Sequence, residues 1–326
     1  MSTNIMIRVD ASCEIGFGHI SRCIVLAKSI GKISKICFIS RFMPEEFIQK
    51  IIQAGFEFLK IENDDNFDIF KDSIVVIDGY SFSSIYQEQV KTVARKLVCI
   101  DELRDIYYHA DVIINNQPCL QPKDFLCKED TRIYSGMQFS MLRSEFISAS
   151  KESAKAKKIK DKKTFFICFG GSDPNNFSEK IIKALLNKYK FCQINLLLGS
   201  GYIHATEFNS SNVKVYKTLG AESLINLIKE SNVAILPAST IMLEAFCVGI
   251  PVISGWYADK QKHTLECLDK GGYILNCGDY RNNFENEMFR LLSTINDEIS
   301  NNFIERQKNI NFDIEFLNEI FSESFV

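Results

Sequence analysis

Short apolar runs recur along the chain, separated by longer segments in which apolar residues lie three or four positions apart. Short runs rich in Ile, Val, Phe and Leu are typical of buried strands, and the three-to-four spacing is typical of amphipathic helices. In the first half the predicted strands are residues 5–9, 35–40, 56–61, 73–78, 96–100 and 111–116. The predicted helices between them are residues 20–31, 44–55 and 84–96. This alternation predicts a parallel, doubly wound α/β sheet.

The same alternation restarts in the second half. The predicted strands there are residues 164–169, 192–198, 213–217, 232–237, 251–254 and 272–275, and the chain from about residue 285 is predicted to form two or three helices. Between the halves, residues 148–163 carry seven lysines against one Glu and one Asp. We interpret this stretch as a solvated linker or helix between the domains, with a phosphate-binding patch as the alternative.

The two halves therefore predict two Rossmann-like domains. The first is expected over residues 1–147, and the second over residues 164–326, including the C-terminal helices. In such folds ligands bind at the carboxyl ends of the strands, so we expect a ligand cleft between the domains.

Composition narrows the possible partners and the compartment. A formal net charge of −3 gives no reason to expect nucleic-acid or membrane binding. No run approaches the ~18 apolar residues of a membrane-spanning helix, and the N-terminus lacks the pattern of a secretory leader. The eleven cysteines are scattered without a C-x-x-C pair, and Cys37, Cys99 and Cys168 lie within apolar runs, as buried thiols do. These features predict a cytoplasmic protein.

Glycines and charged residues gather where the first strand turns into the first helix. Asp10 ends the strand, and Gly16, Gly18, His19 and Arg22 follow it. Glycine permits positive φ and close approach of the backbone to a phosphate, and a helix start offers unpaired N–H groups to an anion. We therefore predict that this turn contributes to a substrate site.

His19 is the candidate catalytic residue of this turn. At the first turn of a helix the dipole favours the neutral imidazole, which can accept a proton from water; the alternative is that His19 only caps the turn. For Asp10 three roles stay open: it orients His19, binds a sugar hydroxyl, or is a satisfied strand-end carboxylate. A dinucleotide site is not favoured, because Ser21 stands where the third glycine of that fingerprint would be.

Glycine turns in the second half are candidate phosphate contacts. Gly170, Gly171 and Ser172 follow one predicted strand, and Gly199 follows the next. Glycine-rich turns at strand ends let backbone N–H groups approach a phosphate, and plain turns are the alternative.

A predicted helix start in the second half carries the stronger signal for a nucleotide diphosphate. Ser239 and Thr240 begin this helix directly after a strand. Glu244 lies one turn further on the same face, where a carboxylate can accept hydrogen bonds from ribose hydroxyls. The alternative for Glu244 is a carboxylate that only complements the helix dipole.

Residues 256–264 follow the next strand and are expected at the same edge of the sheet. Asp259, Lys260 and Gln261 are the candidate sugar or phosphate contacts in this segment. His263 is predicted to lie on a helix surface instead.

Three motifs together resemble one known family. They are IGFGHISRCIVLA at 15–27, FGGSDPNN at 169–176 and STIMLEAFCVGIPVI at 239–253. DGY at 78–80 and SGMQFSMLRSEF at 135–146 extend the likeness. They resemble the UDP-2,4-diacetamido-2,4,6-trideoxy-β-L-altropyranose hydrolases of pseudaminic acid, and hence nonulosonic acid, biosynthesis, whose relatives include spore-coat polysaccharide biosynthesis proteins. The resemblance implies a GT-B-type fold. It also implies a hydrolase that uses no metal or other cofactor, cleaves the anomeric C–O bond with inversion and releases UDP.

The resemblance also implies roles for single residues. His19 would activate water, and Tyr80 would be a second active-site residue. The pyrophosphate and ribose would be held by Ser239, Thr240 and Glu244, with Gly170, Gly171 and Ser172 nearby. The chain departs from the family pattern at Lys260, where Asn is usual, and at Gly79, where His is common. An ammonium at position 260 could neutralise charge on the leaving phosphate or suit a different sugar.

Two other functions remain open at this point. One is a glycosyltransferase with the same donor site, because the helix with Ser239, Thr240 and Glu244 also resembles that of GT-B glycosyltransferases. The other is a nucleotide-sugar-binding protein without activity. The expected partner is a small UDP-sugar in each case, and the sequence does not indicate an oligomeric state.

Overall fold

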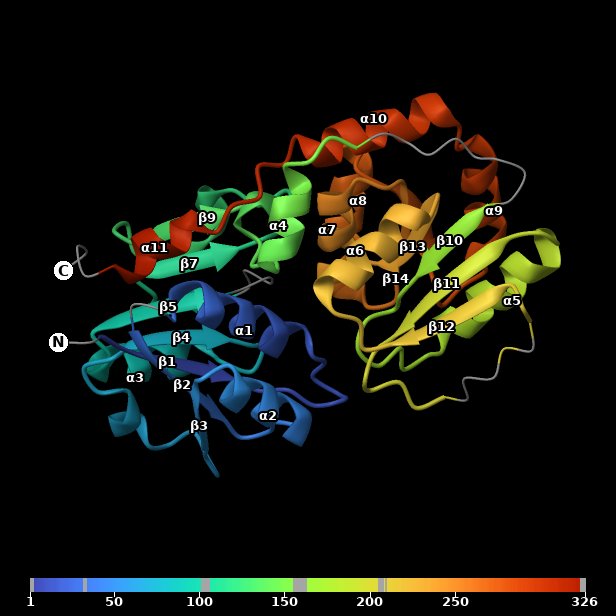
Figure 1. Cartoon of the computed structure of the whole chain (residues 1–326). Helices are drawn as coiled ribbons and strands as arrows, with labels where there is room; N and C mark the ends of the chain where they lie inside the picture. Colours follow the sequence, from blue (N-terminus) through green and yellow to red (C-terminus); the bar gives the residue numbers. More distant parts are fainter. Residues whose placement is uncertain are drawn as a thin grey trace. The chain divides into compact units, whose positions relative to one another are not determined.

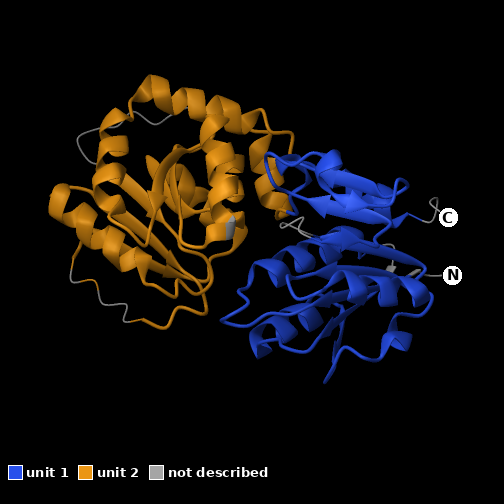
Figure 2. Ribbon diagram, turned by 180° about the vertical axis from the view of Figure 1, so that it is seen from behind, with its two compact units in different colours: residues 1–141, 313–326 blue, residues 142–312 orange. Residues whose placement is uncertain are grey.

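The computed structural model describes residues 3–31, 34–100, 106–154, 163–204, 208 and 210–322. The chain forms two compact units, Met1–Met141 with Asp313–Val326 (unit 1) and Leu142–Phe312 (unit 2) (Figure 2, blue and orange). Each unit is an α/β structure built on its own parallel sheet. No helix within these described residues combines the length and the apolar character needed to cross a bilayer.

Unit 1 contains a seven-stranded parallel sheet with the order β3-β2-β1-β4-β5-β7-β9 (Figure 1). Its strands are β1 Thr3–Val9, β2 Ser34–Ser40, β3 Glu57–Lys60, β4 Ile74–Asp78, β5 Lys96–Ile100, β7 Val112–Asn115 and β9 Arg132–Ser135. Its helices are α1 Gly18–Ile30, α2 Glu45–Gln53, α3 Ser84–Val93 and α11 Glu315–Phe321. Shorter elements are the strand pair β6 Tyr107–Tyr108 and β8 Leu126–Cys127 and the 3₁₀ turns η1 Phe67–Phe70, η2 Pro122–Asp124 and η3 Met137–Phe139.

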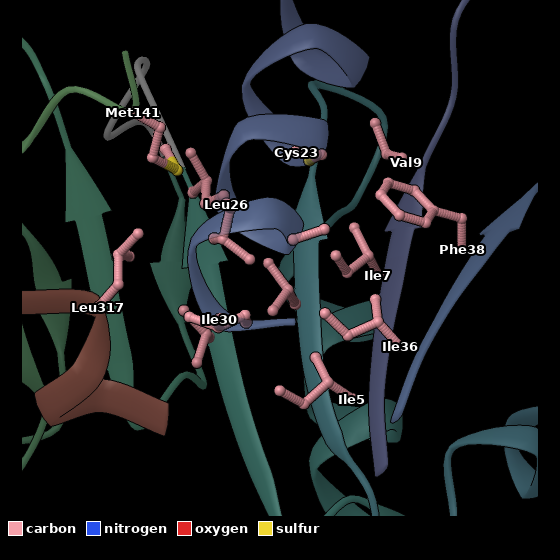
Figure 3. Close-up of a cluster of buried hydrophobic side chains, with 14 of the residues drawn as sticks. Ile5, Ile7, Val9, Cys23, Leu26, Ile30, Ile36, Phe38, Met141 and Leu317 are labelled. Carbon is pink, nitrogen blue, oxygen red and sulfur yellow. The ribbon is translucent and has the colours of Figure 1, made fainter. Parts of the chain in front are cut away.

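The core of unit 1 follows from the two-residue period of its strands. In β1, Ile5, Ile7 and Val9 point to the face that α1 covers (Figure 3). In β4, alternate residues divide between that face and the face covered by α3 and η1. Strand β4 is therefore buried and apolar on both faces up to Asp78, which is why residues 74–77 form a continuous apolar run in the sequence.

Unit 2 contains a six-stranded parallel sheet with the order β12-β11-β10-β13-β14-β15. Its strands are β10 Thr164–Ile167, β11 Gln193–Leu198, β12 Val213–Lys217, β13 Val233–Pro237, β14 Val252–Trp256 and β15 Leu275–Asp279. Its helices are α4 Ser144–Ser150, α5 Phe177–Lys188, α6 Ala221–Glu230, α7 Thr240–Val248, α8 Asp259–Lys270, α9 Phe284–Thr294 and α10 Asp297–Lys308. The predicted fold class, two parallel-sheet Rossmann-like units, is confirmed.

The boundaries of the units differ from the expected ones at both ends of unit 2. Residues 148–150 end helix α4, which packs on α6 and α7 and therefore belongs to unit 2 rather than to a linker. Residues 155–162 of the expected linker lie outside the described residues.

The C-terminal segment belongs to unit 1, although it was expected in the second domain. Phe316, Leu317, Ile320 and Phe321 share one face of α11 and are buried in the same cluster as the residues of β1 and α1. Figure 3 shows Leu317 in this cluster with Met141, Leu26 and Ile30. An amphipathic pattern shows that a helix buries one face, but not which core receives it.

Candidate functional site

The first candidate site lies where β1 and β4 end beside the start of α1. These two strands are neighbours in the sheet, and Val9 is in register with Asp78, the last residue of β4. Parallel neighbours end at the same edge of a sheet. The strand order therefore brings Asp78 next to the first turn of α1, which carries His19.

A buried carboxylate organises this site. The side chain of Asp78 is completely buried, and its Oδ1 lies 2.6 Å from Nδ1 of His19. Nε of Arg22 donates to Oδ2 of Asp78 at 2.6 Å, and Nη2 of Arg22 donates to Oδ1. Burial alone would raise the pKa of Asp78, but the Arg22 guanidinium and His19 outweigh it and hold this pKa well below its usual range. Asp78 is therefore an ionised acceptor for both side chains.

We assign the proton of neutral His19 to Nδ1, because an ionised carboxylate can only accept the hydrogen bond between them. Nη2 of Arg22 lies 3.1 Å from the same Nδ1, as expected when both groups donate to one oxygen. Among the described residues none forms a hydrogen bond with Nε2. The lone pair of the ring is then on Nε2, the atom that could accept a proton.

Tyr80 packs against the imidazole of His19. The two ring centroids are 4.6 Å apart and the rings meet edge to face, at 82°. His19 is 5% exposed and Tyr80 is 39% exposed, so the ring that contacts the buried imidazole is itself accessible to solvent. The predicted pair His19 and Tyr80 is thus brought together by the structure.

Asp10 does not orient His19. Both of its oxygens accept hydrogen bonds from the fully buried Arg8, at 2.7 and 2.8 Å. Its Oδ1 also accepts from Ser40 Oγ and from the backbone N–H of Arg41. Burial alone would raise the pKa of Asp10, but Arg8 and the backbone N–H donors outweigh burial, so the pKa lies below its ordinary value. This is the geometry of a satisfied strand-end carboxylate, and Asp78 takes the position next to His19.

The two glycines before His19 shape the turn. Gly16 has φ +89° and its N–H donates to Ser12 O, so the turn needs a residue that tolerates positive φ. Gly18 is the first residue of α1, and a Cβ there would meet open space. Open space at Gly18 leaves room beside the first N–H groups of the helix.

The second candidate site is the start of α7 in unit 2. Ser239 is the N-cap residue after β13, and Thr240 is the first helical residue. The Ser239 hydroxyl is buried, and among the described residues it has no hydrogen-bond partner. A buried hydroxyl without a partner, beside the unpaired N–H groups of a helix start, is suited to an anion that accepts both.

Glu244 is not a solitary carboxylate. Nε and Nη2 of Arg143 donate to its two oxygens at 2.8 and 2.9 Å, a bidentate pair, and the Arg143 guanidinium lies over the Phe146 ring. Glu244 is 6% exposed. Burial disfavours charge on Arg143, but Glu244 outweighs it and raises the Arg143 pKa. The remaining lone pairs of Glu244 could still accept from ribose hydroxyls.

The glycine turns of unit 2 pack on each other. A Cβ at Gly199 would lie 2.3 Å from Gly171 O, and Gly201 N–H donates to that same oxygen. Gly199 therefore serves the close contact of two loops, whereas a Cβ at Gly170, with φ +76°, would meet no atom within 4 Å. Ser172 follows Gly171 and is half-buried.

Of the candidates at the start of α8, Gln261 is used by the backbone. Its Oε1 accepts from the N–H groups of Tyr257 and Ala258, and its Nε2 donates to Ala238 O. Gln261 thus ties α8 to the residue before Ser239, which makes it a positioning residue for that turn. Because the amide of Gln261 is hydrogen-bonded to the backbone, we do not include it among the residues proposed to contact the substrate.

The other two candidates of this segment are Asp259 and Lys260. Asp259 is exposed and pairs with Arg281, which also pairs with Asp279. Lys260 lies in α8, and its side chain is outside the described residues. His263 is exposed on α8, as predicted. Within the described residues no three His, Cys, Asp or Glu side chains gather closely enough to hold a metal ion.

Two residues of these sites escaped the sequence analysis, Asp78 and Arg143. Their partners lie 59 and 101 positions away in the chain, so no local spacing signals either pair. The available signal for Asp78 was a charged residue at the end of a fully apolar predicted strand, inside the quoted DGY motif.

Comparison with known sequences finds three relatives. The chain is 30% identical over 285 residues to the uncharacterized protein MJ1062 of Methanocaldococcus jannaschii, covering 81% of this chain but only 57% of that protein. It is 26% identical to UDP-2,4-diacetamido-2,4,6-trideoxy-beta-L-altropyranose hydrolase of Campylobacter jejuni, over 82% of this chain and 97% of that one. It is 25% identical to spore coat polysaccharide biosynthesis protein SpsG of Bacillus subtilis, over 82% of each. No family model matches the chain.

Solved structures with this fold have little sequence in common with the chain. MurG of Acinetobacter baumannii superposes with a TM-score of 0.61 at 10% identity, over 95% of each chain. The kitacinnamycin glycosyltransferase superposes with a TM-score of 0.63 at 11% identity, over 97% of this chain and 95% of that one. A complex of Staphylococcus aureus MnaA with UDP gives 0.57 at 12% identity, over 97% and 94%. The chain therefore has a GT-B-type fold of two Rossmann-like units and is similar in sequence to a UDP-sugar hydrolase.

Proposed function

We propose that this protein hydrolyses a UDP-2,4-diacetamido-2,4,6-trideoxyhexose, with His19 as the base that activates water. The observation that carries the proposal is the hydrogen bond between His19 Nδ1 and the buried carboxylate of Asp78, which leaves Nε2 as the proton acceptor. The likeness to a protein named as a hydrolase of such a sugar supports the choice of substrate.

In this proposal unit 1 performs the attack. Nε2 of His19 takes a proton from water as the water oxygen bonds to the anomeric carbon. The anomeric C–O bond breaks, its electron pair leaves with UDP, and the configuration inverts because one displacement occurs. Asp78 stabilises the imidazolium that forms and keeps the ring in its tautomer, an arrangement with which a general base contributes roughly 10²- to 10⁴-fold.

Unit 2 would hold the leaving group. The Ser239 hydroxyl and the first N–H groups of α7, beginning at Thr240, would donate to the pyrophosphate. Glu244, held by Arg143, would accept from the ribose hydroxyls. The open backbone of Gly170, with Gly171 and Ser172, would offer further donors to phosphate. These interactions stabilise the charge that develops on UDP as the bond breaks.

Release of UDP without an acceptor tests this function. The wild-type protein, given the UDP-sugar alone, is expected to form UDP and free sugar in equal amounts. His19→Ala is expected to lower kcat at least ~100-fold while UDP still binds, since the base is lost and the diphosphate contacts lie elsewhere. His263→Ala removes an exposed imidazole of α8 and serves as the matched control.

The other outcomes identify other functions. UDP release that requires an added sugar acceptor would indicate a glycosyltransferase. UDP binding without turnover by any variant would indicate a binding protein. Near-normal turnover by a folded His19→Ala variant would end the assignment of the base.

A further inference from the structure

A cavity of about 220 Å³ in unit 1 lies directly beside Tyr80. It is formed where β4 and β5 end and α3 begins. Its walls are Ile77, Gly79, Tyr80, Ser81, Phe82, Ser83, Gln87, Cys99, Ile100, Ile106 and Tyr108. Tyr80, Ser81 and Ser83 are exposed, so the cavity opens to solvent beside the ring that contacts His19. No step of the proposed hydrolysis uses this space.

Gly79 is a wall of the cavity and packs against Phe82. Its φ is +152°, and a Cβ there would lie 2.9 Å from Cε2 of Phe82. A side chain at this position would strain the backbone and press on the wall of the cavity. The glycine therefore lets the backbone after β4 pass close to the Phe82 ring, which is also a wall of the cavity.

The walls carry apolar side chains, serine and tyrosine hydroxyls, and one amide, that of Gln87, whose orientation is fixed. Gln87 is 3% exposed, and its Oε1 accepts from the N–H of His109 at 3.3 Å. This hydrogen bond fixes the orientation of the amide, so Nε2 is the group left to donate. Among the described residues none accepts a hydrogen bond from this nitrogen. An N–H donor on the wall of a cavity that also carries apolar side chains is matched by a ligand with one carbonyl oxygen and an alkyl group.

We propose that this cavity is the subsite for the N-acyl group on carbon 2 of the sugar, and that it admits acyl chains longer than acetyl. The amide carbonyl of the sugar would accept from Gln87 Nε2, and the alkyl chain would contact Ile106 and Tyr108. Carbon 2 is bonded to the anomeric carbon, so its substituent lies close to His19, and Tyr80, whose ring contacts His19, is also a wall of the cavity. The volume equals that of about seven waters, more than the few heavy atoms of an acetamido group fill.

The proposal rests on the proposed function and is tested with a substrate series. The series consists of UDP-sugars that carry a free amine, acetyl, propanoyl or butanoyl group on the nitrogen at carbon 2. For the wild type we expect kcat/KM for butanoyl within ~5-fold of acetyl, because the chain enters an apolar space. We expect the free amine to be at least ~10-fold poorer, because an ammonium finds no acceptor at Gln87 Nε2.

Two variants assign the effect to this cavity. Ile106→Phe fills the apolar end and is expected to lower the butanoyl-to-acetyl ratio of kcat/KM at least ~10-fold. Gln87→Glu keeps an oxygen for the His109 N–H but removes the NH₂ donor, and is expected to shift preference from acetyl toward the free amine. Ile85→Phe, an equal change at an exposed position of α3 outside the cavity, is expected to leave both ratios at the wild-type values.

Opposite results overturn the subsite. They are equal kcat/KM for amine and acetyl, a loss of butanoyl activity beyond ~100-fold in the wild type, or the same ratios in Ile106→Phe and Ile85→Phe. If the wild type releases UDP from no member of the series, the proposed function fails. Calorimetric binding of the same compounds then decides the subsite separately, because affinity independent of the acyl group would refute it.

Discussion

Asp78 is the buried carboxylate on which the proposed role of His19 depends. It is completely buried and accepts hydrogen bonds from His19 and Arg22. Cys23 also lies beside it, with Sγ 3.4 Å from Oδ2, and burial raises the pKa of this thiol well above its ordinary value. The thiol is therefore a neutral neighbour of the site, and Asp78 with Arg22 fixes the imidazole.

Replacing this carboxylate is expected to impair turnover more than binding. In Asp78→Asn the amide NH₂ faces N–H donors of Arg22 or His19. The imidazole then loses the acceptor that keeps its proton on Nδ1 and the negative charge that stabilises the imidazolium. We expect kcat to fall by ~100-fold or more while KM and UDP affinity change little. Steady-state kinetics and calorimetry with UDP check this, with the exposed Asp68→Asn as the control. A fall in UDP affinity equal to the fall in kcat would indicate a merely structural role.

The same carboxylate makes the stability of unit 1 depend on pH. The Asp78 pKa is lowered in the folded state, so its contribution is complete above the unfolded value of about 3.9 and is lost as the pH falls toward the folded value. We expect the wild type to lose more unfolding free energy than Asp78→Asn between pH 5 and pH 3, in urea titrations. Parallel pH profiles of the two proteins would contradict the lowered pKa.

At the level of elements, the start of α7 is the expected anchor of the diphosphate. Ser239→Ala removes a buried hydroxyl that forms no hydrogen bond with any described residue, so we expect the free energy of unfolding to change little. We expect UDP affinity to fall about 10-fold, because the lost hydrogen bond is to a charged group. Calorimetry with UDP measures this, and Ser293→Ala on the surface of α9 is the control. Unchanged affinity in Ser239→Ala would remove α7 from the diphosphate site.

Helix α11 is expected to stabilise unit 1, although it follows unit 2 in the chain. Leu317 is fully buried in the cluster that contains Leu26 and Ile30 of α1. Leu317→Ala should lower the unfolding free energy by about 2–5 kcal/mol and reduce hydrogen-exchange protection in α1. Asn318→Ala, on the exposed side of α11, is the control. Loss of protection in α5 or α9 instead would place α11 with the other core.

Most of the elements were predictable, because the central strands are apolar runs and most long helices have an apolar period. Two strands were not: β9 was missed, and β15 forms at Leu275–Asp279 rather than at residues 272–275, because neither is a continuous apolar run. What the local pattern could not give is the pairing of distant elements. The neighbours of β1 are decided by strand order, so the approach of Asp78 to His19 is a tertiary result. For the same reason the sequence indicated Glu244 and not Arg143, and placed α11 with the wrong core.

At the scale of the whole molecule, the chain has a GT-B-type fold, and the proposed function would use residues of both units. His19, Asp78, Tyr80 and the cavity beside it belong to unit 1, and Ser239 with Glu244 belongs to unit 2. The glycine turns and helix starts indicated both candidate sites in the sequence, because the backbone geometry at strand ends requires particular residue types. The expected ligand cleft between the units stays a prediction, as do the contacts of Asp259 and Lys260.

Hydrolysis in ¹⁸O-labelled water tests the central claim, that a His19-activated water attacks the anomeric carbon. With the UDP-sugar and no acceptor, mass spectrometry should find one ¹⁸O on carbon 1 of the released sugar and none in UDP. The rate of this labelling should fall at least ~100-fold in His19→Ala. Label in the phosphate of UDP, or an undiminished rate in that variant, would contradict the account.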